Sequence, residues 1–184
     1  LASIRRGIGP ICAHRTGADM STKERDFADV HIPEPIRSGV ILRREGDVAM
    51  TNVPHAVVWH SPTGFEWGYS GSGPADLALN VLEAALASLG FEGPREKCYD
   101  GEAFVAAIRL HQAFKFAFIS NIPREGGTIE WSEIETFVRE GIGEIRKTFE
   151  ATYTLRPDHG PDGEALAEGV DPFEAWIGKL PDAE

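Results

Sequence analysis

A turn rich in glycine and serine is the part of this sequence with the clearest chemical potential. Its residues are Ser70, Gly71, Ser72 and Gly73, and Pro74 follows them. Backbone N–H groups at the start of a helix converge on one point, which is the usual way for a protein to hold a phosphate or carboxylate. The same residues can also form a strand-to-helix corner that needs glycine for close packing. The sequence leaves both interpretations open.

Aromatic side chains and a histidine precede the turn. Trp59 and His60 can frame a pocket for a flat ligand, and either Trp59 or Trp67 can stack on a nucleotide base. Phe65, Trp67 and Tyr69 alternate with other residues, which predicts one face of a strand, and we assign that face to the core. The candidate ligand-binding residues are Ser70, Gly71, Ser72, Gly73, His60, Trp59 and Trp67.

No catalytic constellation accompanies these candidates. The sequence lacks the lysine of a phosphate-binding loop, the dinucleotide glycine spacing, a His-Glu-x-x-His motif and a Cys-x-x-Cys motif. His111 has no partner at a metal-ligand spacing, and Cys98 has no neighbour that would activate its thiol. We therefore expect a protein that works by contact, with no catalytic residue, metal or cofactor.

Composition and charge narrow the classes further. The chain has 184 residues, of which 42% are hydrophobic and 26% charged, as in a globular domain with a sizeable core. A net charge of −11 argues against general binding to nucleic-acid backbones. No apolar run approaches the length of about 18 residues that a membrane helix needs. Together with the two cysteines, Cys12 and Cys98, this predicts a protein of the reducing cytoplasm.

The hydrophobic pattern divides the chain into three parts. We expect an irregular arm over residues 1–38, a core domain over 39–153, and an acidic linker with a short helix over 154–184. In that short helix Phe173, Trp176 and Ile177 are apolar, and they can dock back on the body or bind a partner protein. These three are the candidate partner-binding residues.

The core domain is expected to have an α+β fold. A hairpin over 40–50 with Gly46 near its turn, and further strands up to Tyr69, predict a small antiparallel sheet of three to four strands. About three helices pack on it. The first begins at Pro74, with Ser72 or Gly73 as its cap, and ends at Gly90; the others span about 102–119 and 132–149. Residues 128–131 are expected to be a short extended piece.

Residues 65–82 resemble an uncharacterised family that is common in bacteriophages, prophages and some archaea. The shared run is Phe-x-Trp-Gly-Tyr-x-Gly-Ser-Gly-Pro-Ala-x-Leu-Ala-Leu, and the resemblance extends over about residues 39–145. It implies phage ancestry and carries no known activity. The segment Gly7-Ile8-Gly9-Pro10-Ile11-Cys12 resembles the end of a small phage cysteine module that binds zinc. Cys12 and His14 supply at most two of the four ligands of structural zinc, so we expect no metal here unless the chain extends upstream.

Three functional hypotheses follow. The leading one is a phage-type accessory protein that binds a host protein in the cytoplasm and inhibits a defence or nucleic-acid-processing complex. The alternative is a module that binds or sequesters a nucleotide or phosphate through the turn at Ser70–Gly73. A virion or scaffold component is the third. The oligomeric state is not given by the sequence.

Overall fold

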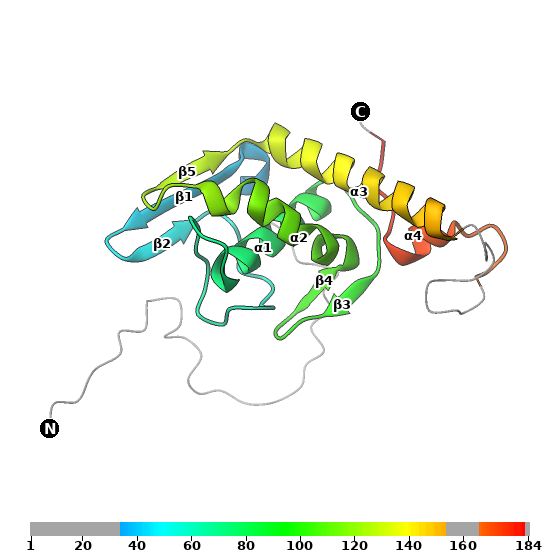
Figure 1. The fold of residues 1–184 in the computed structure, drawn as a ribbon, viewed down its shortest axis with the longest axis horizontal. Coiled ribbons are helices and arrows are strands. Elements are labelled where there is room, and N and C mark those ends of the chain that lie inside the picture. Colours follow the sequence, from blue (N-terminus) through cyan, green and yellow to red (C-terminus); the bar gives the residue numbers. More distant parts are fainter. Residues whose placement is uncertain (1–33, 154–165, 183–184) are drawn as a thin grey trace, which may run out of the picture. The chain divides into compact units, whose positions relative to one another are not determined.

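Residues 34–153 and 166–182 are described by a computed structural model (Figure 1). All of them belong to the unit Ile32–Glu184. The expectations for the arm over 1–33, including Cys12 and His14, and for the linker over 154–165 lie outside these residues. The elements follow in this order: η2 Glu34–Ser38, β1 Val40–Glu45, β2 Val48–Thr51, α1 Ser72–Ser88, β3 Arg95–Lys97, β4 Glu102–Phe104, α2 Val105–Ala117, η3 Ile119–Asn121, β5 Gly126–Ile129, α3 Trp131–Tyr153 and α4 Pro172–Trp176.

The α+β fold is confirmed, with one antiparallel sheet of three strands in the order β2-β1-β5 and a separate β3–β4 hairpin. The β1–β2 hairpin turns at Gly46, whose φ of 60° suits glycine. The alternating strand β1 buries Val40 and Leu42 toward the helices and exposes Ile41 and Arg43. The predicted extended piece before α3 is β5, which pairs with β1.

The strands predicted between Ala56 and Tyr69 are wrong. Residues 56–59 make a single bridge, between Val58 and Asp100, and residues 65–69 form no strand. Gly68 has a φ of 82°, which breaks the alternation: Trp67 is buried, but Tyr69 is half exposed. The apolar–polar alternation in the sequence therefore belongs to an irregular segment packed across α1.

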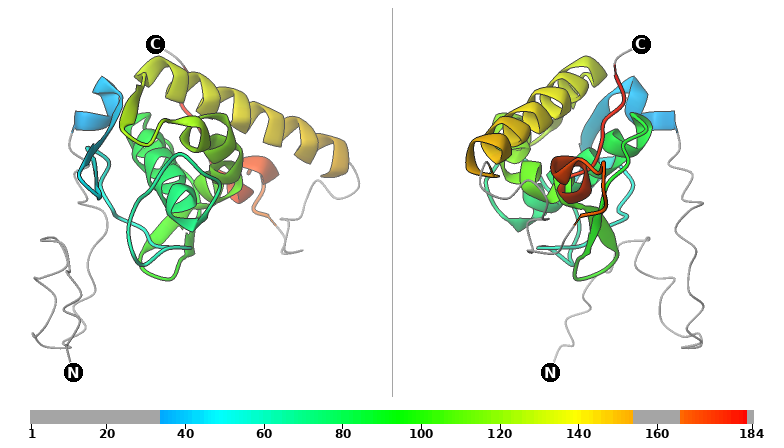
Figure 2. Two further views of the ribbon diagram at one scale, coloured as in Figure 1. Left: turned by 60° about the vertical axis from the view of Figure 1, so that its left-hand side comes forward. Right: turned by 90° about the vertical axis from the view of Figure 1, so that its right-hand side faces the viewer.

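Helix α1 lies at the centre of the described structure. Alanine and leucine dominate its sequence, and both are strong helix formers. Every residue from 73 to 86 is buried, because α2, α3, η2 and the loops surround it (Figures 1 and 2). Its cap is Gly71, with no side-chain cap bond, so the prediction of Ser72 or Gly73 as cap is wrong. It ends before Gly90, as predicted, where φ is 70°.

Three polar side chains lie inside this enclosed helix, one turn apart from each other. Asp76, fully buried, accepts backbone N–H groups of the loop 59–61: that of His60 at 2.8 Å, Ser61 at 2.9 Å and Trp59 at 3.2 Å. A buried carboxylate that receives three donors is stabilised by them, and the donors are satisfied in turn. Asp76 thus fixes this loop to the helix.

Asn80 and Glu83 continue the same row. The Asn80 side-chain oxygen accepts the N–H groups of Ala56 and Val57, each at 2.9 Å, and its amide donates to the Val57 carbonyl at 2.8 Å. Glu83 accepts the Phe104 N–H and pairs with Arg95 at 2.7 Å, which ties the β3–β4 hairpin to α1. Burial raises the pKa of Glu83 to about 7 in spite of Arg95. We call Asp76, Asn80 and Glu83 the polar row.

The C-terminal residues return to the body along α3. Phe173 of α4 packs edge-to-face on Phe149, and Arg146 of α3 pairs with Asp171 at 2.9 Å. A bridge between Glu92 and Lys179 fixes the chain beyond α4. At the other end, Ile36 of η2 is buried, although the sequence placed it in the arm. Within the described residues, η2 and α4 therefore contribute to the same hydrophobic core as residues of the range 39–153.

We expect Asp76→Asn to destabilise the protein by about 2–3 kcal/mol, because the amide group turns a donor toward backbone N–H groups that then lack an acceptor. Urea unfolding followed by circular dichroism measures the free energy of unfolding. Asp47→Asn is the matched control, since the Asp47 side chain is 93% exposed, and its effect should stay within about 0.5 kcal/mol. Equal effects of the two substitutions would contradict the role given to Asp76.

Candidate functional site

His60 and His111 face each other between the loop 59–61 and α2. Their Nε2 atoms are 3.1 Å apart, and the Trp59 ring stacks beside both imidazoles. His111 is buried, and its Nδ1 lies 2.6 Å from the Ile108 carbonyl oxygen, so the proton belongs on Nδ1. The sequence placed Trp59 and His60 together correctly but missed His111 as their neighbour.

A chain of hydrogen bonds links this pair to the glycine-rich turn. Lys115 donates to the Gln112 side-chain oxygen at 2.6 Å and to the Ser70 carbonyl at 3.1 Å. Gln112 then presents its amide to His111 Nε2 at 2.8 Å. Because His111 Nε2 receives this donor, it acts as an acceptor, and His60 must donate to it. Burial lowers the pKa of His111, as expected for an imidazole held neutral.

The turn itself is tightly packed. A Cβ atom on Gly73 would lie 2.9 Å from Glu66 Cβ, and one on Gly71 would lie 2.2 Å from the Tyr69 ring. Glycine is required at position 73, where Glu66 Cβ and backbone lie close, whereas at position 71 the half-exposed Tyr69 ring can move aside; the close approach at Gly73 supports the interpretation of a structural corner. Ser70 and Ser72 are exposed beside it. The four turn residues line neither of the two pockets of the described residues that are considered below.

Trp67 is buried, so its indole offers little surface on which a base could stack. Its side chain is 2% exposed, and its Nε1 donates to the carbonyl oxygens of Pro123 and Arg124 at 3.0 and 3.2 Å. The Arg44 guanidinium lies over the ring at 4.9 Å. The indole is therefore a core residue, as its assignment to the core expected, and its second role as a ligand contact does not fit.

A polar pocket of about 440 Å³ lies beside Trp67, between Arg44 and Arg124. Arg44 is bonded to Glu66, and Arg124 pairs with Asp47 at 2.7 Å. Arg44 also donates to the carbonyl oxygens of Asp47 and Arg124. The guanidinium groups that a phosphate would need each have a carboxylate partner, Arg44 in a partly buried pair and Arg124 in an exposed pair that solvent screens. The pair between Arg44 and Glu66 links the β1–β2 hairpin to the loop before α1.

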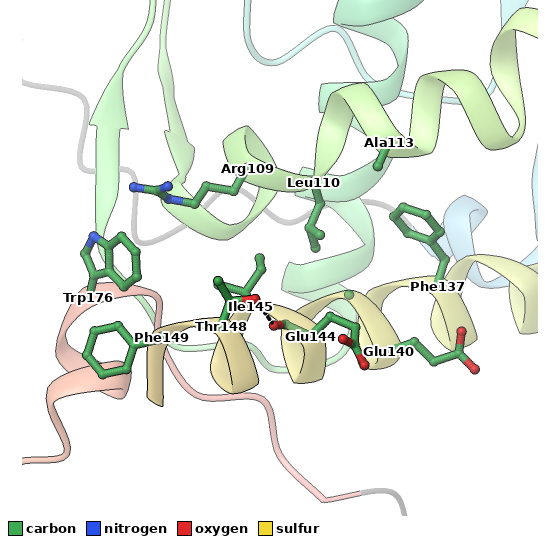
Figure 3. A pocket seen from close by; sticks show the side chains of 11 residues that line it. Arg109, Leu110, Ala113, Phe137, Glu140, Glu144, Ile145, Thr148, Phe149 and Trp176 are labelled. Atoms are coloured by element: carbon green, nitrogen blue, oxygen red, sulfur yellow. Dashed lines mark hydrogen bonds between the residues drawn. The ribbon is translucent and has the colours of Figure 1, made fainter. Parts of the chain in front are cut away.

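An open apolar groove of about 710 Å³ runs between α2 and α3 and ends at Trp176 (Figure 3). We call it the α2–α3 groove. Its lining residues are Arg109, Leu110, Ala113, Phe137, Glu140, Gly141, Glu144, Ile145, Thr148, Phe149 and Trp176. Leu110 and Ile145 point toward each other across it, and Glu140 and Glu144 line the α3 side (Figure 3).

The groove depends on the close approach of two helices and on α4. A Cβ atom on Gly141 would lie 2.7 Å from Leu110 Cδ2, so glycine in the middle of α3 lets α2 come near. At one end, the Arg109 guanidinium lies 4.4 Å from the centre of the Trp176 ring, which also contacts Phe149. Residues from three helices, distant in sequence, thus build the groove.

The three predicted partner-binding residues separate into two kinds. Phe173 and Ile177 are fully buried in the body of this chain, which is one of the two outcomes that the sequence left open. Trp176 is half buried and forms the end wall of the groove. Only Trp176 remains accessible to a partner.

The described residues also bear on a reactive thiol, a metal site and a membrane-spanning helix. Burial, reinforced by Glu83, raises the pKa of Cys98 to about 11, so its thiol is a poor nucleophile at neutral pH. Within residues 34–153 and 166–182, no three His, Cys, Asp or Glu side chains cluster as metal ligands would. In the same residues, no helix combines the length and the apolar character required for crossing a bilayer.

Comparison with known proteins gives a partial family match and no function. Residues 36–93 match a family of unknown function, DUF6166. The match covers less than half of the chain and runs from η2 to just beyond α1, so it contains the glycine-rich turn and the polar row but not the α2–α3 groove. No match was found among curated proteins or among solved structures.

The three residues of the polar row were not predicted from the sequence, although they share one signal. Asp76, Asn80 and Glu83 are polar positions at a helical spacing in a helix that is otherwise apolar around its circumference. Polar side chains in an enclosed helix must find partners within the protein. That reasoning would have identified them as loop-binding residues, whereas the groove has no comparable local signal.

We expect the buried His111 to make the folded state sensitive to acid. The unfolded chain binds a proton at His111 near pH 6.5, whereas the folded protein binds it at a lower pH. The stability that neutral His111 contributes is therefore complete above pH 6.5 and is lost as the pH falls below that value. Urea unfolding at pH 7.5 and pH 5 should show a larger loss for the native protein than for His111→Gln.

His55 provides the internal reference for this experiment. Burial also lowers the pKa of His55, and this histidine is present in both proteins, so its contribution cancels in the comparison. An identical pH dependence in the native protein and His111→Gln would show that His111 is not held neutral.

Proposed function

We propose that this protein is a phage-type accessory protein that binds a host protein and inhibits a defence or nucleic-acid-processing complex. The α2–α3 groove is the single observation that carries the proposal. Its apolar lining is half-buried at Phe137, Ile145 and Trp176, and its rim includes the exposed Glu140 and Glu144. An apolar centre with a polar rim is the usual anatomy of a protein-binding surface.

The charge of the chain supports the choice of partner. A net charge of −11 favours encounter with basic surfaces, and proteins that process nucleic acids carry such surfaces. Acidic side chains along the groove would steer such a partner and fix its orientation. The phage origin rests on the motif over residues 65–82, which lies within the matched family.

A small anionic ligand is the second candidate, favoured by one observation. Lys115 is 5% exposed, and the acceptors of its hydrogen bonds, Gln112 and the Ser70 carbonyl, are both uncharged. No carboxylate of the described residues lies within ion-pair distance of its ammonium group. A phosphate of a nucleotide near Ser70 would supply the missing negative charge, with Trp59 and His60 beside it.

The first hypothesis predicts that the full chain, tagged and expressed in host cells, retains a defined protein through repeated washing. Ala113→Glu places a charge in the apolar groove and should reduce the recovered partner at least tenfold. Ala87→Glu introduces the same side chain at an exposed position outside the groove and should leave recovery unchanged. Thermal unfolding of both variants verifies that the fold is retained.

Recovery of no specific protein, or the same recovery with both variants, would count against host-protein binding through the groove. A partner that carries an acidic rather than a basic surface would contradict the proposed class of target.

The second hypothesis predicts that a nucleotide changes the fluorescence of Trp59. Titration with nucleoside mono-, di- and cyclic phosphates should show a saturable change, which Lys115→Met should weaken at least tenfold because it removes the charge and keeps the length. A flat response to all three classes eliminates the ligand module. Loss of the fluorescence change in Trp59→Phe would identify Trp59 as the tryptophan that responds to the nucleotide.

A further inference from the structure

We infer that the α2–α3 groove receives one basic amphipathic helix of the partner protein. This inference rests on the proposed function and specifies the element that is recognised. It follows from the length of the groove, the placement of its apolar side chains and the distribution of charge along its two sides.

The length of the groove suits a helix of three to four turns. Phe137 and Phe149 line its two ends on α3, and the twelve helical steps between them rise about 18 Å. Helices that bind in grooves typically insert apolar residues at positions i, i+3 or i+4, and i+7, which span about 10 Å, and a fourth at i+11 extends the row to about 16 Å. Two helices already form the walls, so an incoming helix would complete a three-helix packing.

The apolar side chains are placed for such anchors. Leu110 and Ile145 lie opposite each other in the middle of the groove, and Phe137 lies toward one end (Figure 3). Phe149 and the half-buried Trp176 form the other end. One partner side chain would lie between Leu110 and Ile145. Two more would lie toward the two ends of the groove, so that the three contact aliphatic and aromatic surface along its length.

The charges distinguish the two sides. Glu140 and Glu144 are exposed, one helical turn apart on α3. In the described residues Glu140 makes no ion pair, and Glu144 pairs with Lys147 at 2.5 Å. That pair is 70% and 72% exposed, so solvent screens it and a partner cation can share Glu144. On the α2 side Arg109 lies on the Trp176 ring and Ala113 is uncharged.

This asymmetry selects the occupant. A helix with lysine or arginine along one flank of its apolar stripe would place those cations beside α3, at Glu140 and Glu144. A second copy of this chain would bring its own Glu140 and Glu144 to the same surface, and the like charges would repel. An acidic helix is disfavoured for the same reason. The basic amphipathic helix fits both the apolar and the charged features.

The test measures binding of a fluorescent peptide to the full chain by fluorescence polarisation. The probe is a lysine-rich helical peptide of about 14 residues with leucine at i, i+4, i+7 and i+11, so that its apolar row extends over most of the groove. A second peptide has the same leucines and glutamate in place of lysine. We expect saturable binding of the basic peptide, weakening as salt is raised, and at least tenfold weaker binding of the acidic one.

Charge-reversal variants locate the contact. Glu140→Lys combined with Glu144→Lys should weaken the basic peptide at least tenfold and strengthen the acidic one. Glu125→Lys combined with Glu45→Lys changes the net charge equally at exposed positions outside the groove and should leave both affinities within twofold. Equal binding of the two peptides, or equal effects of the two double variants, would overturn the inference.

The same variants separate this inference from the proposed function. If the full chain captures a host protein and Ala113→Glu abolishes capture, but Glu140→Lys with Glu144→Lys does not, the groove binds a partner that is not a basic helix. If no host protein is captured while the basic peptide binds as described, the groove recognises such helices and the proposed host function is wrong. Self-association that these variants abolish would identify a second copy as the occupant and overturn the inference.

Discussion

The polar row of α1 is the constraint on which the rest of the described structure depends. A helix that is buried on all sides has no route to water, so Asp76, Asn80 and Glu83 must be satisfied within the protein. They use mainly backbone groups of the irregular segment 56–61 and of the β3–β4 hairpin. The segment 56–61 and the short β3–β4 hairpin are therefore held in place by their hydrogen bonds to α1.

Local patterns in the sequence predicted the elements whose stability is local. The β1–β2 hairpin has glycine at its turn, α1 and α3 have helical hydrophobic periodicity, and α4 begins with a proline after a capping Asp171. The pairing of β1 with β5 was not predictable in this way, because their partners are separated by more than eighty residues. Alternation over 65–69 misled because Gly68 turns the chain.

In the candidate site, too, features with a local sequence signal were predicted and those made by distant segments were not. The sequence identified the region around Trp59, His60 and the glycine-rich turn, but not the neighbours Lys115 and His111, which α2 brings to it. The sequence predicted almost nothing of the α2–α3 groove, because lining residues such as Arg109, Glu140 and Trp176 are brought to one groove only by folding. Surfaces built from several helices leave no signature in any one of them.

Asp76 and Asn80 bind main-chain amides and carbonyls rather than the side chains of the loop that they hold. Substitutions at positions 59 and 60 would therefore leave those anchoring bonds in place for every residue except proline, which has no N–H to donate. The anchoring of this loop is therefore separate from the side chains that the loop displays at its surface. A loop held by its main chain can be given new side chains without losing its attachment to α1.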